Sequence, residues 1–254
     1  MIVLGNFLMW FAHQGPIFSF GTFYPYLLED FGSTRGETSL VQAVQNTCMN
    51  LMYPIVGGLI VKYGHQRVHL VGAINVSIAV QCCSFSPNVT GMICIYGFGY
   101  GLNAALNLLA SQSLVPKWFT AKKGLATGLA STGGGFGQVV MNPLIRYLCE
   151  EHGWRWAMRV VGFIQFPLFL ASVATMRATP WIKAPPPQAD GKEPPLLDFG
   201  FFKDPVFRAM YLAFCLCSLG FFTPFVHLVR HAMDQGVSAT AATNLMVIVG
   251  ASNT

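Results

Sequence analysis

Residues 117–137, Lys117-Trp-Phe-Thr-Ala-Lys-Lys-Gly-Leu-Ala-Thr-Gly128-Leu-Ala-Ser-Thr-Gly-Gly-Gly135-Phe-Gly137, decide the fold class. Their basic, aromatic beginning separates two apolar stretches, 92–115 and 124–148, each at least the roughly 20 residues that cross a hydrocarbon core as a helix. Glycines four residues apart share one helix face and let a neighbouring backbone approach closely. The two apolar stretches contain three such pairs: Gly97/Gly101, Gly124/Gly128 and Gly133/Gly137. A phosphate-binding loop is the alternative, but no strand precedes the glycines and no Gly-Lys-Ser/Thr follows them, so nucleotide binding is not expected.

The whole composition is typical of a chain that lies in lipid. Hydrophobic residues make up 53% of it and charged residues 10%, against about 25% charged residues in soluble domains, and the mean hydropathy is +0.50. Apolar stretches recur, and we predict spans at 2–28, 40–61, 68–85, 92–115, 124–148, 157–176, 206–229 and 240–254. Helices satisfy their own backbone hydrogen bonds in lipid, so the predicted fold is an all-α polytopic membrane protein.

The order of these spans predicts three parts. Residues 1–176 form a six-helix transmembrane bundle, residues 177–205 a Pro-rich linker, and residues 206–254 the start of a second, incomplete bundle. Two bundles joined by a linker are the plan of many secondary transporters. We therefore expect a C-terminally truncated chain, and a non-transporting isoform or gene fragment is the alternative to a working carrier.

The distribution of charge predicts orientation and excludes other classes of function. With a cytosolic N-terminus, inside loops carry ten Lys and Arg residues and outside segments carry five, which also makes the linker cytosolic. The net charge of +5 is spread over loops, so the expected partner is the lipid bilayer and not nucleic acid. Acids lie outside the spans and the seven cysteines show no metal or disulfide spacing, so we expect no enzyme, metal or cofactor.

Four spaced motifs resemble those of the monocarboxylate transporter family of the major facilitator superfamily. They are Leu28 to Ser39, Gly57 to Arg67, Lys117 to Gly128, and Gly153-Trp154-Arg155. The resemblance implies a solute carrier of the plasma membrane that moves a small monocarboxylate or related polar organic solute by alternating access. It also implies a coupled proton or other ion, and a single-span immunoglobulin-type chaperone as partner.

The chain departs from the proton-coupled lactate carriers of that family at three places. Phe18 stands where those carriers have a lysine, Ala110 stands at the usual proline, and residues 249–254 contain no aspartate. The pattern is more similar to the orphan, creatine, carnitine or aromatic amino acid branches.

The resemblance also implies a substrate site. The family's cavity positions fall on seven residues: Gln14, Phe18, Gln45, Asn46, Asn50, Lys123 and Thr127. Polar groups at membrane depth are costly. Gln45, Asn46 and Asn50 of the stretch 40–61 therefore either line the cavity or hold helices together. Lys123 either meets a carboxylate or anchors the cytosolic rim. His13 and His227 could titrate, although a neutral histidine hydrogen-bonded between helices is favoured for both.

Overall fold

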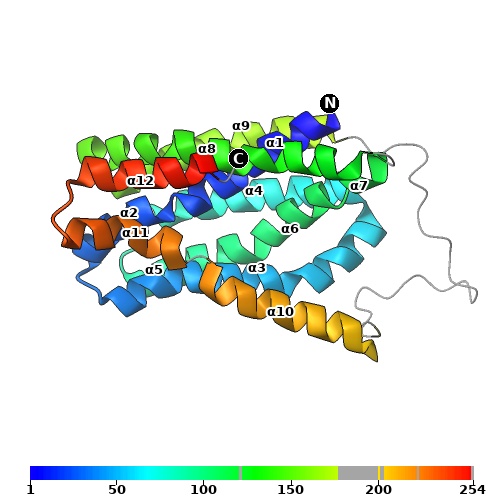
Figure 1. Cartoon of the computed structure of the whole chain (residues 1–254), viewed down its shortest axis with the longest axis horizontal. Coiled ribbons are helices and arrows are strands. Elements are labelled where there is room, and N and C mark those ends of the chain that lie inside the picture. The colour runs from blue at the N-terminus through cyan, green and yellow to red at the C-terminus, as the bar shows by residue number, and fades with distance from the viewer. Residues whose placement is uncertain (120–121, 177–199, 201–202, 222, 253–254) are drawn as a thin grey trace, which may run out of the picture.

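The computed structural model describes residues 1–119, 122–176, 200, 203–221 and 223–252, and none of these residues forms a strand (Figure 1). The chain runs through these helices in order: α1 (Ile2–Phe18), α2 (Phe20–Phe31), α3 (Arg35–Tyr63), α4 (His65–Cys83), α5 (Val89–Met92), the π-helix η1 (Ile93–Tyr100), α6 (Gly101–Gln112), α7 (Val115–Trp118), α8 (Lys123–His152), α9 (Trp154–Thr175), α10 (Pro205–Phe221), α11 (Thr223–Asp234) and α12 (Ala239–Ser252).

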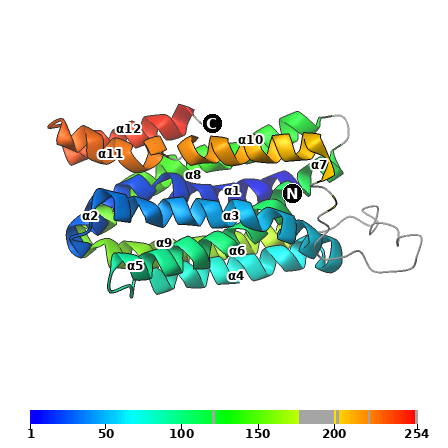
Figure 2. The ribbon, with the colours of Figure 1, turned by 90° about the horizontal axis from the view of Figure 1, so that it is seen from below.

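The long helices lie along one common direction, with their connections at two ends (Figure 1). At one end α3, α6 and α9 finish and α4, α8 and α10 begin; we call it the α7 end. At the other, the α2 end, α2, α4, α8 and α11 finish and α3, α9 and α12 begin. Seen at right angles, α10, α11 and α12 lie together on one side, and α4, α5, α6 and α9 lie on the opposite side (Figure 2).

Three predicted spans, 2–28, 92–115 and 206–229, are built from more than one helix, and the last of them comprises α10 and part of α11. The stretch 2–28 divides at Ser19, whose side-chain hydroxyl donates to the Gly15 carbonyl oxygen at 2.7 Å. Pro16 lacks an N–H group for the helix ladder, so the backbone is weakened close to this break. The stretch 92–115 contains η1, where Tyr96 and Tyr100 stack with ring centroids 4.8 Å apart.

Close backbone approach confirms part of the glycine prediction. A Cβ built on Gly137 of α8 would lie 2.9 Å from the Cα of Gly15 in α1, and one on Gly133 would collide with the Phe7 carbonyl oxygen. Such contacts pack α1 directly on α8. The prediction is wrong for Gly124 and Gly128 among the described residues, because a Cβ built on either would meet no atom of these residues within 4 Å; both lie outside the part of α8 that α1 covers.

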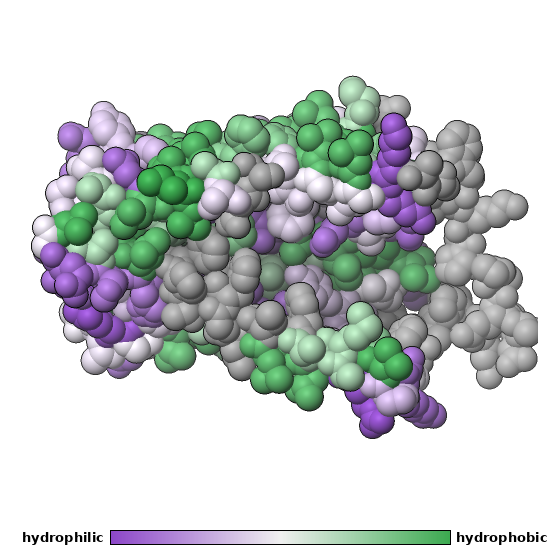
Figure 3. Space-filling view, viewed as in Figure 1, coloured by the Kyte–Doolittle hydropathy of each residue, from purple (hydrophilic) through white to green (hydrophobic). Residues whose placement is uncertain are grey.

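The surface of α8 has the inside-out pattern of a helix in lipid. Its Leu125 and Leu129 are 68% and 58% exposed, and Phe136 is also exposed, whereas Gln138 and Asn142 are fully buried. Much of the outer surface over α10 and α12 is likewise apolar (Figure 3). In the described part of the chain, Val89–Trp118 and Trp154–Thr175 also meet a strict length and hydropathy criterion for a span.

The predicted linker lies mostly outside the described residues, because 177–199 and 201–202 are not described. The helix that follows it, α10, begins at Pro205, the last residue assigned to the linker. The division into a complete and an incomplete bundle stays a prediction.

Candidate functional site

A line of buried polar groups runs along α8 where it faces α2 and α12. The Gln138 amide donates to the Met246 carbonyl oxygen of α12 at 3.0 Å, and the Asn142 amide donates to the Gln138 carbonyl oxygen at 3.1 Å. The Thr22 hydroxyl of α2 donates to Asn142 Oδ1 at 2.7 Å. We call Thr22, Gln138 and Asn142 the polar seam. Sequence reasoning missed these residues, although Gln138 and Asn142 stand four apart and share one helix face.

Two predicted site residues lie next to the seam. A Cβ built on Gly134 of α8 would lie 3.3 Å from the Gln14 Cβ and 3.7 Å from the Phe18 Cε2, so both α1 side chains cover this glycine. Gly134 precedes Gln138 by one helical turn. The structure therefore brings Gln14 and Phe18 to the same part of α8 as the seam.

The three predicted residues of α3 have different surroundings. Gln45 is fully buried, and its Oε1 accepts from the Gln42 amide at 3.2 Å while its own amide faces the Met49 sulfur at 4.0 Å. Asn46 and Asn50 are 5% and 6% exposed and lie one turn apart. Among the described residues, no hydrogen bond joins either asparagine to α1 or to the seam.

Among the described residues, seven buried amide oxygens have no hydrogen-bond partner. They are Asn6 Oδ1, Gln14 Oε1, Gln42 Oε1, Asn46 Oδ1, Asn107 Oδ1, Gln138 Oε1 and Gln165 Oε1. A buried acceptor without a donor costs about 1–3 kcal/mol, so such groups are expected to meet N–H or O–H donors from a solute or from water. The four on Gln14, Gln42, Asn46 and Gln138 come from α1, α3 and α8.

Lys123 and Thr127 lie away from the part of α8 that Gln14 and Phe18 cover. Lys123 is the exposed first residue of α8, eleven positions before Gly134, which corresponds to about 16 Å along a helix. Thr127 is half-buried one turn further along. The structure brings neither residue to Gln14, and the exposed position of Lys123 is the one expected of a rim anchor.

A second polar group lies among the N-terminal helices. His13 Nδ1 is 3.2 Å from the Tyr100 hydroxyl, and the Gln165 amide of α9 donates to the Ala12 carbonyl oxygen at 2.8 Å. His69 Nε2 is 3.0 Å from the Ser172 hydroxyl. His13 and His69 are at most 1% exposed, so these contacts support the interhelical role that the sequence favours for His13.

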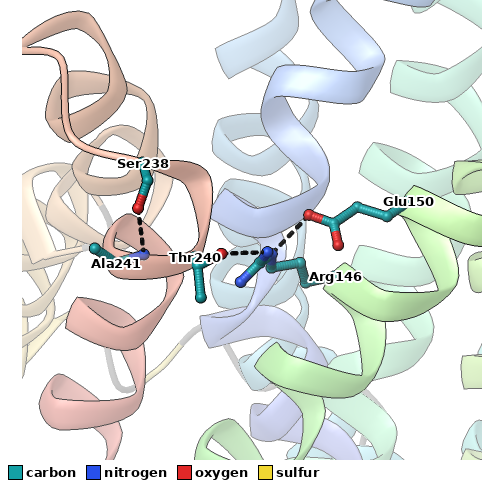
Figure 4. A network of polar contacts seen from close by, with 5 residues as sticks. All are labelled: Arg146, Glu150, Ser238, Thr240 and Ala241. Carbon is teal, nitrogen blue, oxygen red and sulfur yellow. Dashed lines mark hydrogen bonds and ion pairs between the residues drawn. The ribbon is translucent and has the colours of Figure 1, made fainter.

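At the α2 end, charged and polar contacts join α8 and α3 to α11 and α12. Arg146 donates to Glu150 Oε1 at 2.8 Å and, across to α12, to the Thr240 hydroxyl at 2.6 Å (Figure 4). Arg35 of α3 pairs with Asp234 of α11 at 3.0 Å. The α11 and α12 segments are thereby held against the N-terminal helices at this end.

His227 of α11 belongs to the same set of contacts. Its Nε2 is 3.4 Å from the Ser39 hydroxyl of α3, and its ring meets the Tyr24 ring of α2 edge-on at 5.4 Å. A cavity of about 110 Å³ opens nearby, between α2 and the pair α11 and α12, with Glu29 and Arg230 among its lining residues. In the described part of the chain, no three His, Cys, Asp or Glu side chains come together as metal ligands.

Helices that are apolar towards the outside and polar where they meet define a multi-pass helical membrane protein. The chain belongs to the Major Facilitator Superfamily, whose family model matches residues 2–254. This confirms the predicted fold class and the superfamily that the motifs indicated.

Individual relatives narrow the comparison. The chain is 29% identical to monocarboxylate transporter 11 of Mus musculus over 238 residues, which cover 93% of this chain and 52% of that protein. It is 29% identical to human monocarboxylate transporter 14 over 194 residues, covering 76% and 36%, and 24% identical to the MFS-type transporter pynF of Aspergillus niger over 253 residues, covering 99% and 57%. These relatives are transporters rather than enzymes, and the chain spans about a third to just over half of their lengths.

A solved structure supports the fold. The crystal structure of a D-xylose-proton symporter matches 98% of this chain and 64% of that one, with a TM-score of 0.58 at 11% sequence identity. At this identity the match shows the fold alone.

Proposed function

We propose that the chain belongs to a carrier that moves a small monocarboxylate or related polar organic solute across a membrane by alternating access. The observation that carries the proposal is the set of unpartnered amide oxygens on Gln14, Gln42, Asn46 and Gln138. Solute N–H and O–H groups would supply the missing donors. The names of the relatives support a monocarboxylate-type solute, since several are monocarboxylate transporters.

The site would use Gln14, Phe18, Asn46 and Asn50 as predicted, together with Gln138 of the seam. Gln14 and Gln138 lie on helices that touch directly, α1 and α8, and Gln138 also bonds α12. A solute between them would contact helices from both sides of the seam. Movement of α12 relative to α8 would then change access to it. Gln45 and Thr127 stay predictions for this site, and Lys123 stays a prediction either for this site or for the cytosolic rim.

The remaining features of the carrier are proposals from the sequence and its relatives. A proton or another ion would accompany the solute, and an immunoglobulin-type single-span chaperone would assist the protein. The carrier would lie in the plasma membrane, with the α7 end and residues 177–205 in the cytosol. The Lys and Arg distribution is the support for this orientation.

Uptake kinetics test the site. In a carrier of the full length of the relatives that contains this chain, Asn46→Ala should raise the KM for the transported solute about fivefold with little change in surface expression, since one lost hydrogen bond is worth about 1 kcal/mol. The solute would be found with a labelled lactate, creatine and carnitine panel. Asn75→Ala is the matched control, because Asn75 is exposed on α4 and bonds Asn103. An equal KM in the two variants would reject the proposed site.

The alternative function is that of a non-transporting product. Cells that express the 254 residues alone would show no saturable uptake of any panel member if the missing part of the relatives' length is required. Saturable uptake by this chain would contradict that alternative and leave the site proposal standing.

A further inference from the structure

Among the described residues, basic side chains outnumber carboxylates at the α7 end. The ion pairs Arg35–Asp234, Arg146–Glu150, Arg155–Asp30 and Arg230–Asp234 all lie at the α2 end. The described residues of the α7 end include the basic side chains of Arg67, Lys117, Lys122, Lys123, Lys203 and Arg208. The one described carboxylate at this end, Asp204, accepts the Val206 N–H at 2.9 Å. The α7 end therefore attracts anions.

Lys117 is held in place by a group that does not neutralise it. Its Nζ lies 3.3 Å from Nε2 of His65, which is only 8% exposed at the first residue of α4 and outside the predicted span 68–85. Burial, and then the neighbouring Lys117 charge, lower the pKa of His65 to about 4. At neutral pH the His65 imidazole is therefore uncharged, and its Nε2 accepts from the Lys117 ammonium, which holds Nζ of Lys117 at this position.

The same place borders apolar surface. Trp118 follows Lys117 and is 37% exposed, which is the position of an aromatic residue at a membrane interface. Leu125 and Leu129, on the first turns of α8, are exposed immediately after Lys122 and Lys123. Basic groups and an apolar strip thus lie close together where α7 and the start of α8 are in contact.

We propose that Lys117, Lys122 and Lys123 bind the headgroup of an anionic phospholipid, whose acyl chains lie along Leu125 and Leu129. Charge complementarity selects the phosphate and carboxylate groups, and the adjoining leucines select a lipid over a free anion. Lysine stems can lie on the apolar surface while their ammonium groups reach the headgroup. This assigns Lys123 to the lipid at the rim.

Fluorescence quenching by brominated lipids tests the proposal on the 254-residue chain in bilayers. The probe is brominated phosphatidylserine or brominated phosphatidylcholine, diluted into phosphatidylcholine, and the signal of Trp118 is the difference from a Trp118→Phe variant. We expect about a fivefold preference for phosphatidylserine over phosphatidylcholine at Trp118, in line with the attraction of basic residues to anionic lipid. Lys117→Gln/Lys123→Gln should reduce this preference to about one.

Two further variants keep the result interpretable. Lys203→Gln/Arg208→Gln removes the same charge from the same end, just before and within the first turn of α10, and should keep the preference. Lys117→Arg/Lys123→Arg keeps the charge and should also keep the preference for phosphatidylserine. If Lys203→Gln/Arg208→Gln loses the preference for phosphatidylserine equally, the whole α7 end attracts anionic lipid and the proposed site is overturned. The absence of any preference in the unmodified chain would overturn it as well. Full competition by 20 mM inorganic phosphate, taken as about the upper physiological range, would show a free-anion site and also overturn it.

Discussion

Replacing Gly137 with alanine tests the direct packing of α1 on α8. The new Cβ would lie 2.6 Å from the Phe11 carbonyl oxygen and 2.9 Å from the Gly15 Cα, whereas ordinary contacts begin at 3.4 Å. The closest contact is about 0.8 Å too short, and it meets backbone, which cannot rotate away. Such overpacking costs about 1–3 kcal/mol, and the better helix propensity of alanine offsets at most about 1 kcal/mol.

We therefore expect Gly137→Ala to lower the unfolding free energy by about 1–2 kcal/mol. The measurement is an SDS titration of the micellar protein, followed by tryptophan fluorescence. Gly128→Ala is the matched control, since it lies on the same helix with nothing within 4 Å and should be neutral or slightly stabilising. The packing argument is refuted if both variants unfold at the same SDS fraction.

Three further predictions concern the helix ends. Thr34→Ala should cost about 1 kcal/mol in the same titration and Thr34→Ser much less, because the Thr34 oxygen accepts the Glu37 N–H in a capping box. The unfolding free energy should fall as the pH is lowered from 6.5 to 4, because folded His65 has a pKa of about 4 and stays neutral where the unfolded chain gains a proton. His65→Gln should make this fall less steep, and an unchanged slope would contradict the prediction. Asp234→Asn breaks the Arg35–Asp234 pair. It should make an impermeant maleimide modify a cysteine placed at Thr22 about threefold faster. Equal rates with and without Asp234→Asn would show that this ion pair does not close the α2 end.

The apolar stretches predicted the helices well because hydropathy acts over a whole span. The interruption at Ser19 depends on one hydroxyl and its Gly15 partner, which a window of about 20 residues averages away. The glycine pairs likewise depend on a detail that the sequence does not contain. Their spacing predicts a close helix contact equally for Gly124/Gly128 and for Gly133/Gly137, but α1 crosses α8 only at the second pair.

The Gly153-Trp154-Arg155 motif could be found from the sequence, but its physical role could not. Gly153 adopts a φ of 83°, which favours glycine, and begins α9 at the α2 end. Trp154 meets the Phe31 ring at 5.3 Å, and Arg155 pairs with Asp30 at 2.9 Å. The motif thus fastens the start of α9 to the end of α2, a contact between segments more than 100 residues apart.

The candidate site combines residues from two sources. Gln14 and Asn46 come from family positions and stay predictions, whereas Gln138 and Asn142 of α8 come from the structure. Gln138 and Asn142 are buried and four residues apart, as Asn46 and Asn50 are. They follow a glycine-rich stretch, however, for which helix packing alone is a sufficient interpretation. Neighbouring faces of α8 serve the two purposes, since Gly133 and Gly137 bring α1 close while Gln138, about 100° further round the helix, reaches α12. The packing on α1 and the proposed solute contact can therefore be changed separately, and Gln138→Leu keeps the side-chain volume while it removes the amide.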